Sequence, residues 1–322
     1  MPEACLADSI TTLSMRAQLA IKAFRLWTVC LFIWGLASAG CLAGEVHRAI
    51  IEERFDDALK LLQEDASLMK AKDLQNNKPL HLAALKGSTN LVSYLIAQGA
   101  EVNSRNKFGQ TPLHRAMVEG HYAVAKLLID ANAEVNGRDN QGVIPVHVAA
   151  HRRHGKLVEL LLEHGAEVDA QDAFRRRPIN MSIMGSSDES LRALVKAGAD
   201  YNYIDNHGNS FLHLAAGGGS PALVITFLEL KLGVNAINSS KFTPAHFAAQ
   251  GGHKEVLEVL DKWGGDFNMR SANKRTPLDL VKAIRDPFRM SRHDEVQIYL
   301  EKWHATHKAE EADAITKSPA KP

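Results

Sequence analysis

A short sequence pattern returns about every 33 residues along most of this chain, a spacing typical of repeat proteins. Its clearest copy, residues 111–116, reads T-P-L-H-R-A. The proline position of the successive copies is occupied by Pro79, Pro112, Pro145, Pro178, Phe211, Pro244 and Pro277. A fixed period of this length indicates a stack of one supersecondary unit rather than a single compact core. We therefore expect one elongated array with no internal linker.

The unit at residues 106–138 predicts a turn followed by two short helices. Gly109 suits the positive φ of a tight turn, Thr111 suits a helix N-cap, and Pro112 suits the first helical position. A Gly-His pair ends that helix, and a second helix is expected over 123–130. Neither helix buries its apolar face alone, so neighbouring units must share a core. Such burial contributes about 25 cal/mol for each Å² removed from water.

The T-P-L-H-x-A pattern at this period resembles the ankyrin repeat. The resemblance covers about residues 45–303 and implies an all-α fold, a solenoid of helix-turn-helix units with short β-hairpin loops. Residues 45–72 are expected to form the N-terminal cap, 73–270 six repeats, and 271–303 the C-terminal cap, because terminal units need one polar face. The polar remainder, 304–322, is expected to be a flexible tail.

Histidines recur at one place in the repeat. They are His81, His114, His147, His213 and His246. A catalytic or metal-binding role would have to recur in nearly every unit, so a structural role is favoured. The resemblance implies that each histidine hydrogen-bonds near the preceding threonine and braces adjacent loops. In the fourth repeat Arg177 and Asn180 replace the threonine and the histidine, and we expect the brace to be lost there.

Charge and motif content exclude several classes of function. The chain has 38 Lys plus Arg and 37 Asp plus Glu, so positive and negative charges are almost equal in number. Nucleic-acid binding needs a cationic excess, so it is not expected. There is no nucleophile elbow, H-E-x-x-H motif or phosphate-binding loop, and the repeats leave no room for a catalytic domain. We expect a non-enzymatic protein without a cofactor or a metal site.

Residues 1–44 predict a targeting segment. Three basic residues precede an uncharged run at 26–43, and Ala37-Ser38-Ala39 supplies small residues for cleavage, as in a secretory signal peptide. The repeats would then lie in the periplasm or outside the cell. All three cysteines lie in this segment, and a body without cysteine agrees with export.

Other interpretations of this segment stay open. Gly40-Cys41 resembles the end of a bacterial lipoprotein signal, which would make Cys41 a lipidation site, although Ser38 stands where that signal usually has leucine. Alternatively, the uncharged run at 26–43 would span a bilayer uncleaved and tether a scaffold, the only membrane contact expected. If the segment does not target at all, the chain would be a cytosolic adaptor or effector.

The function must lie in the positions that vary between repeats. The resemblance implies that partners meet the hairpin tips and inner helices on the concave side. Basic and aromatic residues project there: Arg105, Lys107, Phe108, Arg138, His151, Arg152, Arg153, Phe174, Arg175 and Arg176. Because arginine and aromatic side chains anchor interfaces, we expect another protein with an acidic surface to bind them. The alternative is that these are scattered, solvated charges.

Overall fold

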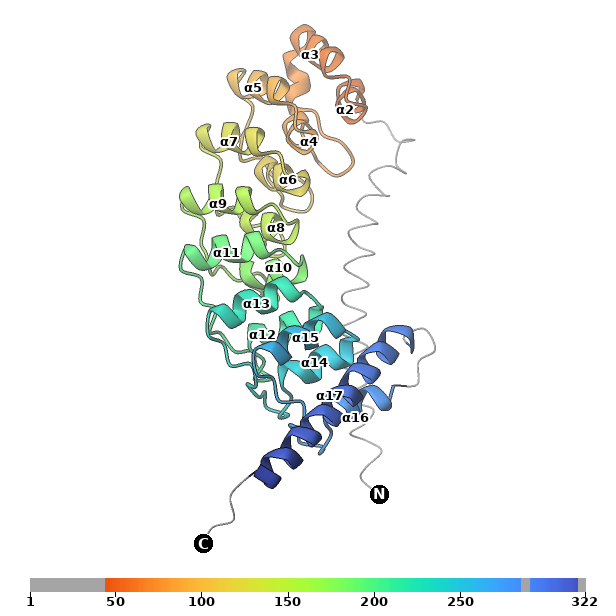
Figure 1. Cartoon of the computed structure of the whole chain (residues 1–322). Helices are drawn as coiled ribbons and strands as arrows, with labels where there is room; N and C mark the ends of the chain where they lie inside the picture. Colours follow the sequence, from red (N-terminus) through yellow and green to blue (C-terminus); the bar gives the residue numbers. More distant parts are fainter. Residues whose placement is uncertain (1–43, 285–289, 318–322) are drawn as a thin grey trace, which may run out of the picture.

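The computed structural model describes residues 44–284 and 290–317 (Figure 1). The signal or anchor segment expected at 1–44, with Cys41, therefore lies almost entirely outside the described residues. The described part is built from helices and turns, with one isolated antiparallel bridge between Ile204 and Ser210. Helices follow one another in antiparallel pairs, and each pair stacks on the next.

The first helices of the pairs form one layer. They are α2 (Glu45–Ile51), α4 (Pro79–Lys86), α6 (Pro112–Glu119), α8 (Pro145–His151), α10 (Pro178–Met184), α12 (Phe211–Gly218), α14 (Pro244–Gly251) and α16 (Pro277–Lys282). The second helices form the other layer. They are α3 (Phe55–Glu64), α5 (Thr89–Ala97), α7 (Tyr122–Asp130), α9 (Gly155–Glu163), α11 (Asp188–Lys196), α13 (Pro221–Glu229), α15 (Lys254–Lys262) and α17 (Met290–Lys317). A short 3₁₀ helix, η1 (Ala66–Lys70), follows α3.

The start and end of the first helices follow from local chemistry. In α6 the Thr111 side chain accepts a hydrogen bond from the backbone N–H of His114, and Pro112 occupies the first turn. Gly120 ends the helix in the left-handed region, at φ 82°. Proline costs nothing at the first turn because its missing N–H would have no partner there.

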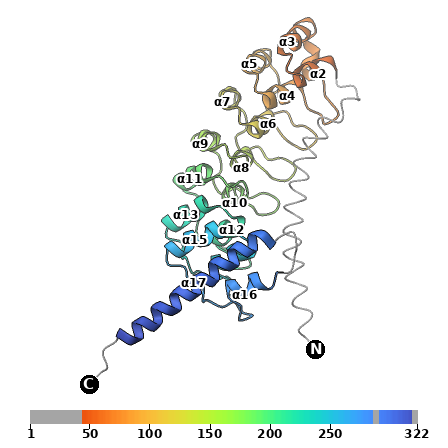
Figure 2. The same ribbon diagram turned by 45° about the vertical axis from the view of Figure 1, so that its right-hand side comes forward.

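The loops between repeats are tight turns rather than strands. In the second repeat the turn closes with Asn106 N donating to Gln110 O at 3.0 Å, and Gly109 N donating to Asn106 O at 2.9 Å. Neighbouring turns are joined, because Lys107 N donates to Gln75 O at 2.8 Å. The hairpin tips therefore form a connected row along one side of the stack (Figure 2).

The hydrophobic core runs through the whole stack instead of closing into one centre. Leu113 and Met117 from α6 are fully buried, as are Val124 and Leu128 from α7, and equivalent side chains recur in each repeat. Each helix pair thus shares its apolar surface with both neighbours. The stack bends, and the first helices and hairpin tips lie on the inside of the bend (Figure 1).

The last repeat departs from the period. His253 donates from Nε2 to Gly217 O at 3.1 Å, and the two residues are 36 positions apart. His293 makes the same contact with Gln250 O at 3.1 Å, but here the separation is 43 positions. α17 is therefore the second helix of this repeat, displaced along the chain by an insertion before it. Its Val296 and Leu300 side chains are fully buried.

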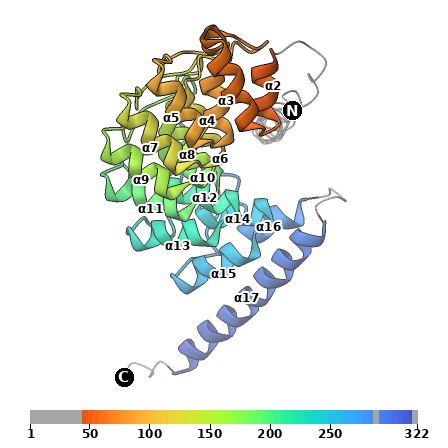
Figure 3. The same cartoon turned by 90° about the horizontal axis from the view of Figure 1, so that it is seen from above.

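The structure differs from the prediction of a flexible tail beginning at residue 304. α17 continues to Lys317 and runs out beyond the stack (Figure 3). The reason is that His304 stands where the preceding repeat ends its second helix with Gly264, at φ 82°. No glycine or proline interrupts the sequence from 305 to 317, so the helix continues.

Candidate protein-binding surface

Each recurrent histidine links its own repeat to the next. His114 illustrates the geometry: its Nε2 lies 3.0 Å from Val143 O in the following repeat, and its Nδ1 lies 3.2 Å from Thr111 N. A carbonyl oxygen can only accept, so Nε2 carries the proton and Nδ1 accepts from the backbone N–H. The equivalent Nε2 atoms of His81, His147, His213 and His246 lie 3.0–3.1 Å from a carbonyl of the next repeat.

Burial keeps these rings neutral. It lowers the pKa of His81 and His114 to about 4, although the hydrogen bonds to Gln110 O and Val143 O act in the opposite direction. Burial also lowers the pKa of the other three. The sequence pattern missed His47, which donates to Asn77 O at 3.1 Å and links the first helix pair to the first repeat. It precedes His81 by slightly more than one period, so a search at fixed spacing does not find it.

The fourth repeat keeps half of this brace. Asn180 Oδ1 accepts from Arg177 N at 2.9 Å, where a histidine Nδ1 accepts in the other repeats. Within the described ranges, no hydrogen bond joins the Asn180 side chain to the next repeat. The Arg177 side chain instead lies 3.1 Å from Asp200 and 4.3 Å above the ring of Tyr203.

Two of the predicted partner-binding residues join neighbouring hairpins within the fold. Arg105 donates to the backbone O of Arg138 and lies 3.5 Å from Glu134. Arg138 repeats this arrangement one repeat later, donating to Gln171 O at 2.8 Å and to Glu167 at 3.1 Å. Both arginines brace neighbouring hairpins, and a nearby carboxylate offsets the charge of each.

The fourth hairpin brings together an aromatic ring and two further predicted arginines. Phe174 is 64% exposed at the tip, and the guanidinium of Arg176 lies 4.7 Å from the centroid of its ring. Arg176 also pairs with the buried Asp172 at 2.7 Å. Arg175 lies at the turn, with φ 58°. The tip therefore presents a ring that is held in place beside a second cation.

A cationic cluster lies on the first-helix side of the third and fourth repeats. It consists of two arginines, Arg152 and Arg176, beside the neutral ring of His151 at the end of α8. Burial lowers the pKa of His151 to about 4, and the charges of Arg152 and Arg176 act in the same direction. Arg115 of α6, which the repeat pattern does not single out, belongs to the same region: burial lowers its pKa and the charge of Arg152 adds to that effect, while the charges of Asp73 and Glu119 oppose it. Arg115, Arg152 and Arg176 thus bring positive charge from three repeats, and Asp172 offsets that of Arg176.

The remaining predicted residues are spread around this cluster. Arg152, Arg153, Arg175 and Lys107 form no ion pair with a carboxylate among the residues that the structure describes. Arg153 is exposed with φ 68°. Phe108 is half-buried, two repeats from Phe174, and its backbone O accepts from Asn140 N at 3.0 Å. The structure thus gathers His151, Arg152 and Arg176, whereas Lys107 and Phe108 belong to the second hairpin.

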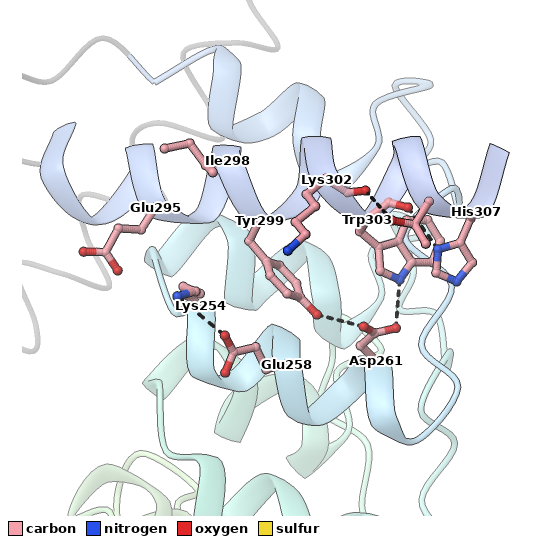
Figure 4. A pocket seen from close by; sticks show the side chains of 10 residues that line it. Lys254, Glu258, Asp261, Glu295, Ile298, Tyr299, Lys302, Trp303 and His307 are labelled. Atoms are coloured by element: carbon pink, nitrogen blue, oxygen red, sulfur yellow. Dashed lines mark hydrogen bonds and ion pairs between the residues drawn. The ribbon is translucent and has the colours of Figure 1, made fainter. Parts of the chain in front are cut away.

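A groove of about 550 Å³ lies between α15 and α17 at the far end of the stack (Figure 4). Asp261 of α15 accepts from the Tyr299 hydroxyl at 2.9 Å and from Trp303 Nε1 at 2.8 Å. Burial and the neighbouring Asp261 raise the pKa of Tyr299. The His307 ring stacks on Trp303, with the ring centroids 3.8 Å apart. These contacts fix α17 on the array, so the groove is explained by helix docking.

Two further features bear on chemistry. Across residues 44–284 and 290–317, no three His, Cys, Asp or Glu side chains are grouped so that they could hold a metal ion. Within the same residues, no helix has the length and apolar character needed to cross a membrane.

Comparison with known proteins gives consistent matches to one family. The model for ankyrin repeats (3 copies) matches residues 46–139, 80–172, 136–205 and 182–271. The human ASB11 ankyrin repeat domain is 29% identical, with a TM-score of 0.58, over 67% of this chain and 96% of that domain. The ankyrin repeat domain of Bcl-3, a member of the IkappaB protein family, is 26% identical, with a TM-score of 0.54, over 63% of this chain and 93% of that domain.

A curated relative matches over a short segment. Serine/threonine-protein kinase VIK of Arabidopsis thaliana is 43% identical over 52 residues, which are 16% of this chain and 12% of that kinase. The family model, by contrast, spans well over half of the chain. The chain therefore belongs to the ankyrin repeat family, whose repeats form protein–protein interaction modules.

Proposed function

We propose that this chain is an exported, non-catalytic binding protein that holds a partner protein through an acidic part of the partner's surface. The observation that supports this most directly is the cluster of His151, Arg152 and Arg176, which adjoins the exposed ring of Phe174. Arg152 and Arg175 bring positive charge that no described carboxylate pairs with. A partner carboxylate would meet these two arginines here, and charge-assisted hydrogen bonds to arginine are the strong ones.

The shape of the array agrees with this function. The first helices and hairpin tips line the inside of the bend, so a partner placed there touches several repeats together (Figure 1). Arginine and aromatic residues are the side chains that most often dominate binding energy. The histidine and arginine braces hold the repeats in register, which lowers the entropy lost when the partner binds.

Affinity capture with the tagged full-length chain tests the proposal. Partners are identified by mass spectrometry, and capture is repeated with Arg152→Glu. We expect the variant to lose its partner, because charge reversal at the centre of the cluster repels a carboxylate. Lys86→Glu is the matched control, since Lys86 holds the same place two repeats earlier, outside the cluster. Undiminished capture by Arg152→Glu, at an unchanged melting temperature, would refute the site.

We also propose export, on the basis of the basic residues, apolar run and small residues at 16–39. Fractionation of the tagged chain and the intact mass of its mature form test this. A start after Ala39 would show cleavage, a lipid mass on Cys41 would show a lipoprotein, and an intact leader in the membrane fraction would show a tethered scaffold. An intact chain in the cytosol would contradict export and favour an adaptor or effector.

A further inference from the structure

One row of equivalent residues changes its chemistry along the array. It holds the residue just before each hairpin: Lys72, Arg105, Arg138, Gln171, Ile204, Ile237 and Arg270. The row is basic through the third repeat, neutral in the fourth, apolar in the fifth and sixth, and basic again at Arg270. Ile204 is 58% exposed and Ile237 is 52% exposed.

Members of this row are close neighbours in space. Arg138 reaches the backbone of its successor, donating to Gln171 O at 2.8 Å, so a side chain at this position extends toward the next repeat. Ile204 and Ile237 hold the same positions in consecutive repeats. Together these two exposed side chains make up the apolar strip of the array.

The ends of the first helices change in the same direction. The position of Arg152 is glycine in the next three repeats, at Gly185, Gly218 and Gly251. Packing explains two of them, because an added Cβ would lie 2.3 Å from His151 O at Gly185 and 2.4 Å from the His253 ring at Gly251.

Packing does not explain Gly218. An added Cβ would meet no atom within 4 Å, and the backbone is not in the left-handed region. The helix surface in the repeats that carry Ile204 and Ile237 is thus free of protruding side chains at this position. Met184, one repeat after His151 in the same register, is 41% exposed at the edge of this surface.

We infer that the partner segment has two parts, an acidic one that contacts the cationic cluster and an aliphatic or aromatic one that contacts Ile204 and Ile237. This inference rests on the proposed function and adds the chemistry of the second part. Phe174 offers both kinds of contact, because Arg176 stacks on its ring while the ring remains exposed. The acidic part would bind through charge complementarity with the arginines. The aliphatic or aromatic part would bind because it buries the two isoleucines against apolar side chains.

Selection from a random peptide library displayed on phage, with the full-length chain as target, tests this inference. We expect the enriched peptides to carry Asp or Glu residues next to a cluster of aliphatic or aromatic residues. Selection on Ile204→Glu/Ile237→Glu should keep the acidic residues and lose the apolar ones. Selection on Arg152→Glu should lose the acidic ones.

A peptide enriched on the unmodified chain then serves as the probe for affinity. Its Kd should rise about tenfold or more with Ile204→Glu/Ile237→Glu, and also with Gly218→Trp, which fills the open surface. Two controls should stay within about twofold of the unmodified chain. Gly218→Ala adds only a methyl group, and Ile298→Glu changes an isoleucine that is 65% exposed on α17, away from this strip. Melting temperatures establish that each variant is folded.

The other outcomes separate the inference from the proposed function. Enrichment of acidic peptides without apolar residues would overturn the inference and leave the acidic site intact. A peptide Kd that does not change with Ile204→Glu/Ile237→Glu would have the same meaning. Enrichment of peptides without acidic residues, or a peptide Kd that does not change with Arg152→Glu, would overturn both the inference and the proposed function. Enrichment no greater than on a surface without protein would also overturn both.

Discussion

The Nε2 atom of His114 lies 3.0 Å from the carbonyl oxygen of Val143, which belongs to the next repeat. This one contact serves two purposes. It gives a buried ring the hydrogen-bond partner that burial requires, and it fixes the distance between consecutive hairpins, from which the binding side chains project. The stability of the array and the shape of its binding surface are therefore coupled.

Replacing His114 by asparagine copies the natural sequence of the fourth repeat. The short side chain can still accept from Thr111 N, as Asn180 accepts from Arg177 N at 2.9 Å, but it cannot reach Val143 O. We expect the free energy of unfolding to fall by about 1–3 kcal/mol, because a buried hydrogen bond between repeats is lost. Urea denaturation followed by circular dichroism measures this, and an unchanged midpoint would show that the brace contributes nothing.

The reverse substitution is expected to stabilise the fourth repeat. Asn180→His supplies the ring whose equivalent in the third repeat, His147, donates to Arg176 O at 3.1 Å. The gain should be about 0.5–1.5 kcal/mol, the net contribution of one hydrogen bond. Hydrogen exchange over the segment 178–204 reports it locally. Faster hydrogen exchange in the variant would mean that the natural pair, Arg177 and Asn180, stabilises this repeat more than a histidine does.

Acid should destabilise the array before the carboxylates titrate. The folded pKa of His81 and His114 is about 4, below the ordinary value of 6.5, so the unfolded chain binds more protons between these values. Their contribution to stability is therefore complete above pH 6.5 and is lost as the pH falls toward 4. Each of these two histidines costs about 1.4 kcal/mol at about pH 5.5. Melting temperatures measured from about pH 7.5 to about pH 4.5 check this, and His114→Asn should show a shallower slope. A flat profile would contradict neutral burial of the rings.

Asp261 is expected to fix α17 on the array. Asp261→Ala leaves the Tyr299 hydroxyl and Trp303 Nε1 without their acceptor, at a cost of about 1–3 kcal/mol. Hydrogen exchange over the segment 292–307 should accelerate, with little change in the second repeat. Glu258→Ala is the control, because Glu258 lies on the same helix and pairs with Lys254, at 3.6 Å. Equal hydrogen-exchange rates in both variants would show that Asp261 does not hold α17 on the array.

The positions of the helices were predictable because each depends on local chemistry that recurs. Thr111, Pro112 and Gly120 together specify the start and the end of one helix. The end of α17 was not predicted, since it depends on a missing signal: His304 replaces a glycine, but an insertion earlier in the last repeat conceals the equivalence. A search at the fixed period does not align these two positions.

The sequence predicted which basic residues lie on the candidate binding surface, but not which of them are paired with carboxylates. Register placed Arg105, Arg138 and Arg152 on the same side of the array, and all three are basic. Only the three-dimensional structure shows that Arg138 is paired with Glu167 of the next repeat, whereas Arg152 lies beside His151 and Arg176. Side-chain pairing depends on how far each residue reaches across the repeat boundary, and spacing alone does not contain that information.

Two charge reversals at one structural position test the partner site most directly. Arg175 and Lys241 occupy the same place in the hairpins of the fourth and sixth repeats, with φ 58° and 57°. Affinity for the captured partner is measured by calorimetry with Arg175→Glu and with Lys241→Glu. We predict that Kd rises about tenfold or more for Arg175→Glu and changes less than about twofold for Lys241→Glu. Equal effects of the two reversals would contradict a partner site built on the cationic cluster and the adjoining tip of the fourth hairpin.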